Sequence, residues 1–455
     1  MSALARLFHS KGSLISGSDK EHSSYIEDLQ SEGMKNIWTP HNKTNVEKAN
    51  PDYIIYSTAI TNDNEELKWA KENNKNILHR SELLKIAFQN KKLISISGTH
   101  GKTTTSAMVT EILVKSGLNP SAIIGGIIQT KNTNSITGNG DYFIAEADES
   151  DKSFLKGDPE IAVITNIEPD HLENYPGGFE EIKKSFLEFA KKAISKTGLV
   201  ACIQDKVTKE IITKNFNLND SKLITYGIGE KSDQATISAK RNDQNNCWDI
   251  YIKNELATSI SLKIPGEHNV LNALAALGVC HLIGIDYEKY KKVIENHEGV
   301  KRRFQIILKT KELTIVDDYA HHPTEIAATI KAAKELNPAR LIVILQPHQP
   351  KRLKDLWEEF KQVLRDEDNC IVFITDTYIA RGQEITGISS QKLVEEIGKP
   401  DVKYIPGNIE QIAQYLEKFI KTEDFILIMG AGNITNLSQK LLKFNHLLAS
   451  RFGNN

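Results

Sequence analysis

The stretch "SISGTHGKTTTSAMV", Ser95–Val109, determines how this sequence is interpreted. The apolar run "KKLISISG" overlaps its start and predicts a buried strand, and the residues from Lys102 to about Val114 predict a helix. Gly98 and Gly101 lie between the two. Backbone N–H groups in such a glycine loop, followed by a helix N-terminus, form a concavity suited to phosphate. The stretch therefore predicts a nucleotide-binding loop in an α/β sheet.

The spacing of this loop differs from the usual G-x-x-x-x-G-K-[ST] pattern, because Ile96 stands where the first glycine would be. We expect a shorter loop, G-T-H-G-K-T, in which Lys102 reaches the β- and γ-phosphates and the Thr103 hydroxyl binds Mg²⁺. A glycine turn with an incidental lysine is the alternative. The strand before the loop and the helix after it favour the phosphate site.

The composition is that of an ordinary globular protein, with 40% hydrophobic and 25% charged residues and a net charge of −2. A net charge this small provides no general basic field for nucleic acid. No apolar run approaches the roughly 20 residues of a membrane helix. The four cysteines form no C-x-x-C pair, which argues against a disulfide framework or a zinc site. We expect a cytoplasmic protein with neither nucleic acid nor membrane as a partner.

The 455 residues suggest about three domains. Alternating strands and helices predict an α/β fold throughout. Residues 1–88 predict a Rossmann-like domain that lacks its first strand and glycine loop, since the chain begins within the helix that normally follows them. Residues 89–301 predict a P-loop ATPase-like domain with an inserted small β-sheet. Residues 302–455 predict a second doubly wound, Rossmann-like domain.

Acidic side chains follow the next predicted strand, in "IAEADESD". Glu146 stands at the strand end, where ligands of open α/β sheets bind, so we expect it to bind Mg²⁺. The acidic residues that follow could surround this ligand without binding the metal themselves: Asp148, Glu149 and Asp151. The alternative is an acidic loop exposed to solvent.

A third predicted strand ends in "TNIEPDHLENY", which contains Asn166, Asp170 and His171. A single histidine is more often structural than a ligand. Because His171 follows a carboxylate and a predicted Mg-ATP site, we favour a metal or phosphate contact for it.

Several motifs occur in order along nearly the whole chain: "GTHGKTTT", "AEADESD", "TNIEPDHLENY", "GEHNVLNALAA", "RRF", "DDYAHHPTEI", "LQPH" and "MGAGNITNL". Together they closely resemble the Mur ligase family. The resemblance implies ATP-dependent ligation of L-alanine to the lactyl carboxylate of UDP-N-acetylmuramate, through an acyl phosphate and a tetrahedral intermediate, for peptidoglycan synthesis. It implies ATP and Mg²⁺ as cofactors and a monomer or homodimer.

The resemblance also implies roles for particular residues. The catalytic residues would be Lys102, Glu146, His171 and Arg303. The metal would be bound by Thr103, Glu146 and His171. ATP would be contacted by Gly98, Thr99, His100, Gly101, Lys102, Thr103, Thr104, His268, Asn269, Asn272, Arg303, Asp318 and Tyr319. The UDP-sugar and the amino acid would be contacted by Ser18, Asp19, Ser57, Asn166, His321, His348 and Arg352.

The sequence departs from the family pattern in three places. The missing glycine loop before the first helix predicts weak UDP-sugar binding, which some twenty to thirty upstream residues would restore. Gln349 replaces an arginine in "QPHQPKR" and cannot make a charge-assisted fork to a carboxylate or phosphate, although Lys351 could compensate. Phe186 stands where several relatives carry a carbamylated lysine, so we expect no such modification.

Two other functions stay open at this point. One is a Mur-type ligase that adds a different amino acid or a recycled tripeptide. The other is a catalytically impaired homologue that only binds UDP-sugar or ATP, suggested by the missing glycine loop and Gln349. The full set of loop, metal and nucleotide residues argues against the impaired protein.

Overall fold

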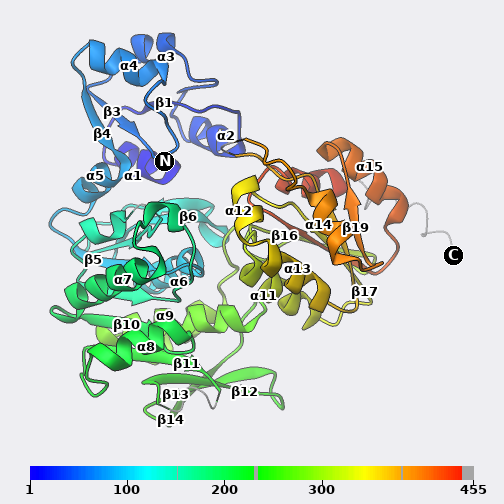
Figure 1. Ribbon diagram of the computed structural model, residues 1–455. Coiled ribbons are helices and arrows are strands. Elements are labelled where there is room, and N and C mark those ends of the chain that lie inside the picture. The colour runs from blue at the N-terminus through cyan, green and yellow to red at the C-terminus, as the bar shows by residue number, and fades with distance from the viewer. Residues whose placement is uncertain (151, 230–233, 381–382, 443–455) are drawn as a thin grey trace. The chain divides into compact units, whose positions relative to one another are not determined.

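The computed structural model describes residues 1–150, 152–229, 234–380 and 383–442 of the chain (Figure 1). Asp151, one of the acidic residues considered above, lies outside them. The chain forms two compact units. The first unit comprises Met1–Ser261 and Leu271–Asn296, and the second comprises Leu262–Val270 and His297–Asn455. The predicted domain boundaries at residues 88/89 and 301/302 stay predictions.

The first 88 residues of the first unit alternate short helices and short strands, as predicted. The helices are α1 (Ser2–Ser10), α2 (Ser24–Ser31), α3 (Lys43–Ala49), α4 (Glu65–Glu72) and α5 (Arg80–Ala87). The strands are β1 (Ser16–Ser18), β2 (Asn36–Trp38), β3 (Tyr53–Tyr56) and β4 (Asn76–His79). They pair in parallel as β1–β2 and β3–β4, two separate pairs in the described residues. Parallel pairing with helical connections is the predicted α/β pattern.

The rest of the first unit is built on one large sheet. Its strands are β5 (Lys92–Ser97), β6 (Ser121–Ile128), β7 (Thr133–Ile136), β8 (Tyr142–Glu146), β9 (Ile161–Ile164), β10 (Gly198–Cys202), β11 (Leu223–Ile228), β12 (Ile237–Asn242), β13 (Cys247–Ile252) and β14 (Glu255–Ile260). Within the described part of the chain their order is β14-β13-β12-β11-β10-β9-β5-β8-β6-β7. Strand β5 therefore lies between β8 and β9, and the carboxyl ends of these three parallel strands meet at one edge.

Helices cover both faces of this sheet. The helices are α6 (Lys102–Lys115), α7 (Gly178–Ile194), α8 (Lys206–Asn215), α9 (Glu267–Leu282) and α10 (Tyr287–Glu295), and the short 3₁₀ turns are η1 (Gln129–Lys131), η2 (Ser153–Lys156) and η3 (Leu172–Asn174). Figure 1 shows α6 and α7 beside the strands. Successive strand residues point to opposite faces. Leu199 packs in the core under α7, whereas its neighbour Val200 faces Gly278 of α9.

Phe186 is part of the core beneath α7. It is 1% exposed, and its ring lies 5.1 Å from that of Phe154. A charged, carbamylated lysine would not fit such an apolar environment without a polar partner.

The inserted antiparallel strands do not form a sheet of their own. Strand β12 pairs in parallel with β11, and the antiparallel strands β13 and β14 follow it. The predicted small inserted sheet is therefore an extension of the central sheet at one edge. Continuous backbone hydrogen bonding leaves no exposed strand edge between them.

The second unit contains the predicted second doubly wound sheet. Its strands are β15 (Gln305–Lys309), β16 (Leu313–Asp318), β17 (Arg340–Leu345), β18 (Cys370–Thr375), β19 (Val402–Ile405) and β20 (Asp424–Met429). Its helices are α11 (Pro323–Lys334), α12 (Pro350–Asp355), α13 (Trp357–Asp366), α14 (Ser390–Ile397) and α15 (Ile409–Phe419). Among the described residues the strand order is β15-β16-β20-β17-β18-β19, with only β15 antiparallel. Alternate residues such as Val343 and Ile344 enter separate cores on the two faces.

Two further expectations can be compared with the fold. No helix in the described ranges is both long and apolar enough to cross a membrane. The four cysteines are all free and buried.

Candidate active site

The loop between β5 and α6 has the conformation expected of a glycine loop. Gly98 and Gly101 have φ angles of 137° and 85°, which disfavour residues with a side chain. A Cβ atom on Gly98 would lie 2.1 Å from Thr165 Oγ1, so packing excludes one as well. Helix α6 begins at Lys102, directly after Gly101. The loop thus presents a helix N-terminus at the edge where β5, β8 and β9 end.

The segment after β9 holds this loop in place. Asn166 accepts a hydrogen bond from the backbone N–H of His100 at 2.9 Å and donates one to its carbonyl at 3.0 Å. Thr165 Oγ1 donates to the same carbonyl at 2.6 Å, and the N–H of Glu168 donates to Thr99 Oγ1 at 2.9 Å. The Asn166 side chain, predicted to contact substrate, is therefore engaged with the loop backbone.

Thr103 and Glu146 lie together, as the metal-site prediction requires. The Thr103 hydroxyl donates a hydrogen bond to Glu146 Oε2 at 3.1 Å. The backbone N–H of Gly125, in β6, donates to Glu146 Oε1 at 2.5 Å. A hydroxyl beside a carboxylate is a donor set that suits Mg²⁺, which prefers oxygen ligands and retains several waters. The residues present therefore fit this metal.

Lys102 forms an ion pair with Glu149, a residue of the loop after β8. Its Nζ donates to Glu149 Oε1 at 2.8 Å and also to the carbonyls of Gly98 and Thr99. Burial opposes the charged form of the amine, but the nearby carboxylates, Glu149 above all, leave the pKa of Lys102 above its ordinary value. The lysine predicted to bind phosphate is thus fully protonated.

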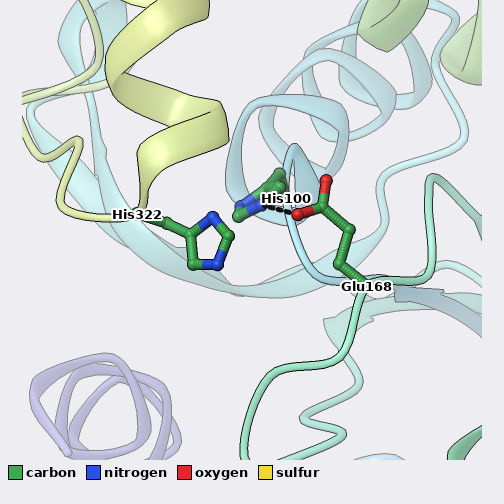
Figure 2. Close-up of side chains that lie close together, drawn as sticks. All are labelled: His100, Glu168 and His322. Carbon is green, nitrogen blue, oxygen red and sulfur yellow. Dashed lines mark ion pairs between the residues drawn. The ribbon is translucent and has the colours of Figure 1, made fainter. Parts of the chain in front are cut away.

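The histidines near the loop have carboxylate neighbours. His100 and Glu168 face one another (Figure 2), with 3.4 Å between Nε2 and Oε2. His171 has a left-handed φ of 54°, and its Nε2 lies 3.5 Å from Asp170 Oδ2. Figure 2 also draws His322, which belongs to the second unit, where it caps the N-terminus of α11. The cap is a structural contact of His322.

Three residues of α9, His268, Asn269 and Asn272, were predicted to contact ATP. Asn272 accepts a hydrogen bond from Thr105 Oγ1 of α6 at 3.2 Å, which ties the two helices together. Asn269, at the start of the helix, donates to the carbonyl of Pro265 at 2.7 Å. Burial, followed by the positive charge of Arg303, lowers the pKa of His268 to about 4. His268 is therefore neutral at pH 7.

In the second unit, predicted site residues converge at the carboxyl edge of the sheet. The guanidinium of Arg303 lies over the Tyr319 ring, 5.2 Å from its centroid. The Asp318 carboxylate accepts hydrogen bonds from the N–H groups of Phe304 and Ala320 at 2.6 and 2.7 Å. Burial raises the pKa of Asp318 to about 6. Asp318 is therefore anchored by backbone groups at the end of β16.

The histidines predicted to face the acceptor belong to one aromatic row. The ring centroids of His321 and His348 are 5.7 Å apart, and His348 stacks on Tyr378 at 5.8 Å. Burial lowers the pKa of His321 to about 4. Arg352 Nη1 lies 3.5 Å from His348 Nδ1. His321, His348 and Arg352 are thus brought together, and Tyr378, which sequence reasoning missed, extends the row.

The side chain of Lys351, a possible substitute for the missing arginine, has a carboxylate partner on its own helix. Lys351 forms an ion pair with Asp355, one helical turn later on α12. Gln349 precedes that helix with a left-handed φ of 65°.

The first 88 residues hold a polar cluster around Ser18. Its hydroxyl lies 2.8 Å from His41 Nδ1 and donates to Glu66 Oε2 at 2.5 Å. Glu66 also accepts from the N–H of Asn42 at 3.1 Å. Ser18 was predicted as a substrate contact together with Asp19 and Ser57, whereas His41 and Glu66 were missed. Neither carries a local motif, and only the tertiary fold brings them to Ser18.

Gly125 was also missed, although the sequence contains a signal for it. It interrupts the apolar strand β6, and a glycine inside a strand often marks a close approach of another group. A Cβ atom there would lie 2.8 Å from Glu146 Oε2. The paired glycines in "IIGGII" were therefore a usable signal.

Comparison with known protein families matches most of the chain to the domains of one family. Three family models match: the Mur ligase family catalytic domain over residues 1–92, the Mur ligase middle domain over residues 96–280, and the Mur ligase glutamate ligase domain over residues 302–432.

Curated relatives match at similar coverage. The UDP-N-acetylmuramate–L-alanine ligase of Carboxydothermus hydrogenoformans is 39% identical over 97% of this chain and 94% of its own length. The ligase of the same name from Caldanaerobacter subterraneus is 39% identical, over 98% and 95% of the two chains. The crystal structure of such a ligase from Thermotoga maritima aligns with a TM-score of 0.80 and 26% identity, over 98% and 96% of the two chains.

Proposed function

This chain belongs to the Mur ligase family, and we propose that it joins L-alanine to the lactyl carboxylate of UDP-N-acetylmuramate and converts ATP to ADP and phosphate in the same reaction. The similarity to L-alanine ligases over nearly the whole length carries this proposal. The phosphate loop, with Lys102 at the start of α6, supplies the chemical reason for it.

The first step forms an acyl phosphate. An oxygen of the lactyl carboxylate attacks the γ-phosphorus of ATP, and ADP leaves. Phosphoryl transfer depends on positioning and on neutralising charge rather than on covalent help from the protein. Lys102 and the N–H groups of the loop would neutralise the phosphates. Thr103 and Glu146 would hold Mg²⁺, which supplies further positive charge when it is bound.

The second step forms the amide. The amine nitrogen of L-alanine attacks the acyl carbon, and the tetrahedral intermediate expels phosphate. The amine has to be neutral for this attack, and it loses a further proton to solvent as the amide forms. A histidine with a pKa of about 4 is a weak base, but its neutral ring can accept a hydrogen bond from the amine and orient it. His321, whose pKa is lowered to about 4, is neutral at pH 7 and lies with His348 and Arg352. We assign these three residues to the amino-acid side of the reaction.

The identity of the acceptor amine is the part of the proposal that Gln349 affects, because this residue stands where an arginine was expected. The test is mass analysis of the product formed from UDP-N-acetylmuramate, Mg-ATP, a mixture of amino acids and a tripeptide. We expect the mass increase of one alanine residue. Incorporation of another amine would replace L-alanine in the proposal. No product, with ATP still bound by a folded protein, would identify an impaired homologue.

A further inference from the structure

Three protein oxygens engage the amine of Lys102. It donates to Glu149 Oε1 at 2.8 Å, to the Thr99 carbonyl at 3.2 Å and to the Gly98 carbonyl. An ammonium group has three donors, so these contacts use all of them. A phosphate oxygen can bind Lys102 only if at least one of these acceptors gives way.

Of the three acceptors, Glu149 can leave Lys102 with the smallest change in the backbone. Gly98 and Thr99 belong to the loop itself, where Thr165 and Asn166 pack against them. Glu149 reaches Lys102 through a side chain alone. Displacing that side chain leaves the loop that binds phosphate intact.

The backbone of Glu149 is nevertheless held firmly. Its carbonyl accepts a hydrogen bond from the Tyr175 hydroxyl at 2.5 Å and another from the Lys152 N–H at 3.2 Å. The side chain is 10% exposed, and its second oxygen, Oε2, is buried and accepts no hydrogen bond from the described residues. A buried carboxylate with one unsatisfied oxygen depends on its single cation, since the charge is otherwise costly.

We propose that Glu149 is a positioning residue that occupies Lys102 as a stand-in for phosphate in the nucleotide-free protein and is displaced when ATP binds. The inference rests on the proposed function, in which this loop binds ATP. Glu149 stabilises the empty site and competes with the phosphates, so it weakens nucleotide binding and favours release of ADP.

The test is nucleotide binding by Glu149→Gln, measured by calorimetry with ATP, ADP and AMP in the presence of Mg²⁺. The variant loses a charge-assisted hydrogen bond in the nucleotide-free protein but none in the complex. We therefore expect Glu149→Gln to bind ATP and ADP about tenfold more tightly than the wild type. AMP has no β- or γ-phosphate for Lys102 to contact, so we expect its affinity to be unchanged.

A matched control is Glu181→Gln. Glu181 loses the same charge and the same kind of bond, to Lys152 Nζ at 2.5 Å, but does not contact Lys102. We expect this variant to bind all three nucleotides like the wild type. A gain of equal size in Glu181→Gln would overturn the proposal, because it would trace the effect to overall charge.

Thermal unfolding separates displacement from a purely structural role. If ATP displaces Glu149, Glu149→Gln lowers the Tm of the empty protein but not that of the ATP-saturated protein. If the pair persists in the complex, both Tm values fall equally and the affinity does not improve, which would contradict the proposal. Glu149→Ala is a second variant for which we expect the same pattern of Tm values with and without ATP. Failure of the wild type to bind ATP at all would refute the proposed function itself.

Discussion

The carboxylate of Glu146 occupies the space that a side chain at position 125 would need. Gly125 donates its N–H to Glu146 Oε1, and both carboxylate oxygens lie within 2.9 Å of an ideal Cβ at that position. Real Cβ atoms do not approach oxygens this closely, so any larger residue has to displace Glu146. The metal site therefore depends on the absence of one methyl group.

We predict that Gly125→Ala raises the Mg²⁺ concentration needed for half-maximal activity by about tenfold, because a displaced carboxylate is a poorer ligand. Titration of activity with Mg²⁺ at saturating ATP measures this. Activity should recover at high Mg²⁺. A loss that Mg²⁺ does not restore would indicate damage to the strand rather than to the metal site.

Gln349 stands where the resemblance to the family predicts an arginine near the amino acid. A guanidinium can bind a carboxylate through two parallel hydrogen bonds, which an amide cannot do with the same strength. We predict that Gln349→Arg lowers the KM for L-alanine by about tenfold and leaves the KM for ATP unchanged. Steady-state kinetics with each substrate varied in turn checks this.

The control for that variant is Lys351→Gln. Since Lys351 is paired with Asp355 on α12, we expect the KM for L-alanine to stay as in the wild type. A large rise in the KM for L-alanine in Lys351→Gln would show that the lysine does replace the missing arginine.

At the scale of elements, the phosphate loop depends on the strand beside it. The segment after β9 contributes the Asn166 amide, which both donates to and accepts from the His100 backbone. The loop conformation is therefore a property of two neighbouring strand ends rather than of the glycines alone.

We predict that the isosteric change Asn166→Asp raises the KM for ATP by about tenfold, because the donor to the His100 carbonyl is lost. A structural role for Asn166 leaves the KM for UDP-N-acetylmuramate unchanged, whereas a direct substrate contact would raise it. Asn174→Asp is the control, since Asn174 donates to the Ser150 carbonyl at 2.7 Å without contacting the loop. It should leave both values unchanged.

At the scale of the whole molecule, each unit has its own sheet and its own apolar cores. The second unit also contains two half-buried histidines, His268 and His321, whose pKa values are both lowered to about 4. In the unfolded chain a histidine has a pKa of about 6.5. Above that pH both states are neutral, so the histidines do not change stability with pH there.

We predict that each histidine lowers the stability of the second unit by on the order of 3 kcal/mol as the pH falls from 6.5 towards 4, because only the unfolded state takes up the proton. Asp318, whose pKa is raised to about 6, opposes this loss below pH 6, since there the folded state takes up the proton first. Hydrogen exchange followed by peptide mass analysis measures this, with peptides of β16 and β17 compared with those of β5 and β9. The double variant His268→Gln and His321→Gln should flatten the pH dependence, and exposed His22→Gln should not. If the stability of the double variant changed with pH as steeply as that of the wild type, the effect would not come from these two histidines.

The sequence by itself determined the local parts of this protein. The buried strand, the two glycines and the helix that starts at Lys102 follow from hydrophobic pattern and backbone preference within a few residues, and the structure confirms each of them. The alternating strands that predict two doubly wound sheets are local signals of the same kind. Glu146 could be chosen because a strand end is visible in sequence.

Only the tertiary structure decided which distant residues contact these local elements. The order that puts β5 between β8 and β9 is not encoded in any one segment, and it is this order that brings Glu149 to Lys102 and Asn166 to His100. The extension of the central sheet by β12–β14 likewise depends on which edge is free. Hydrogen bonds and ion pairs between distant segments depend on distance in space, which local propensity does not contain.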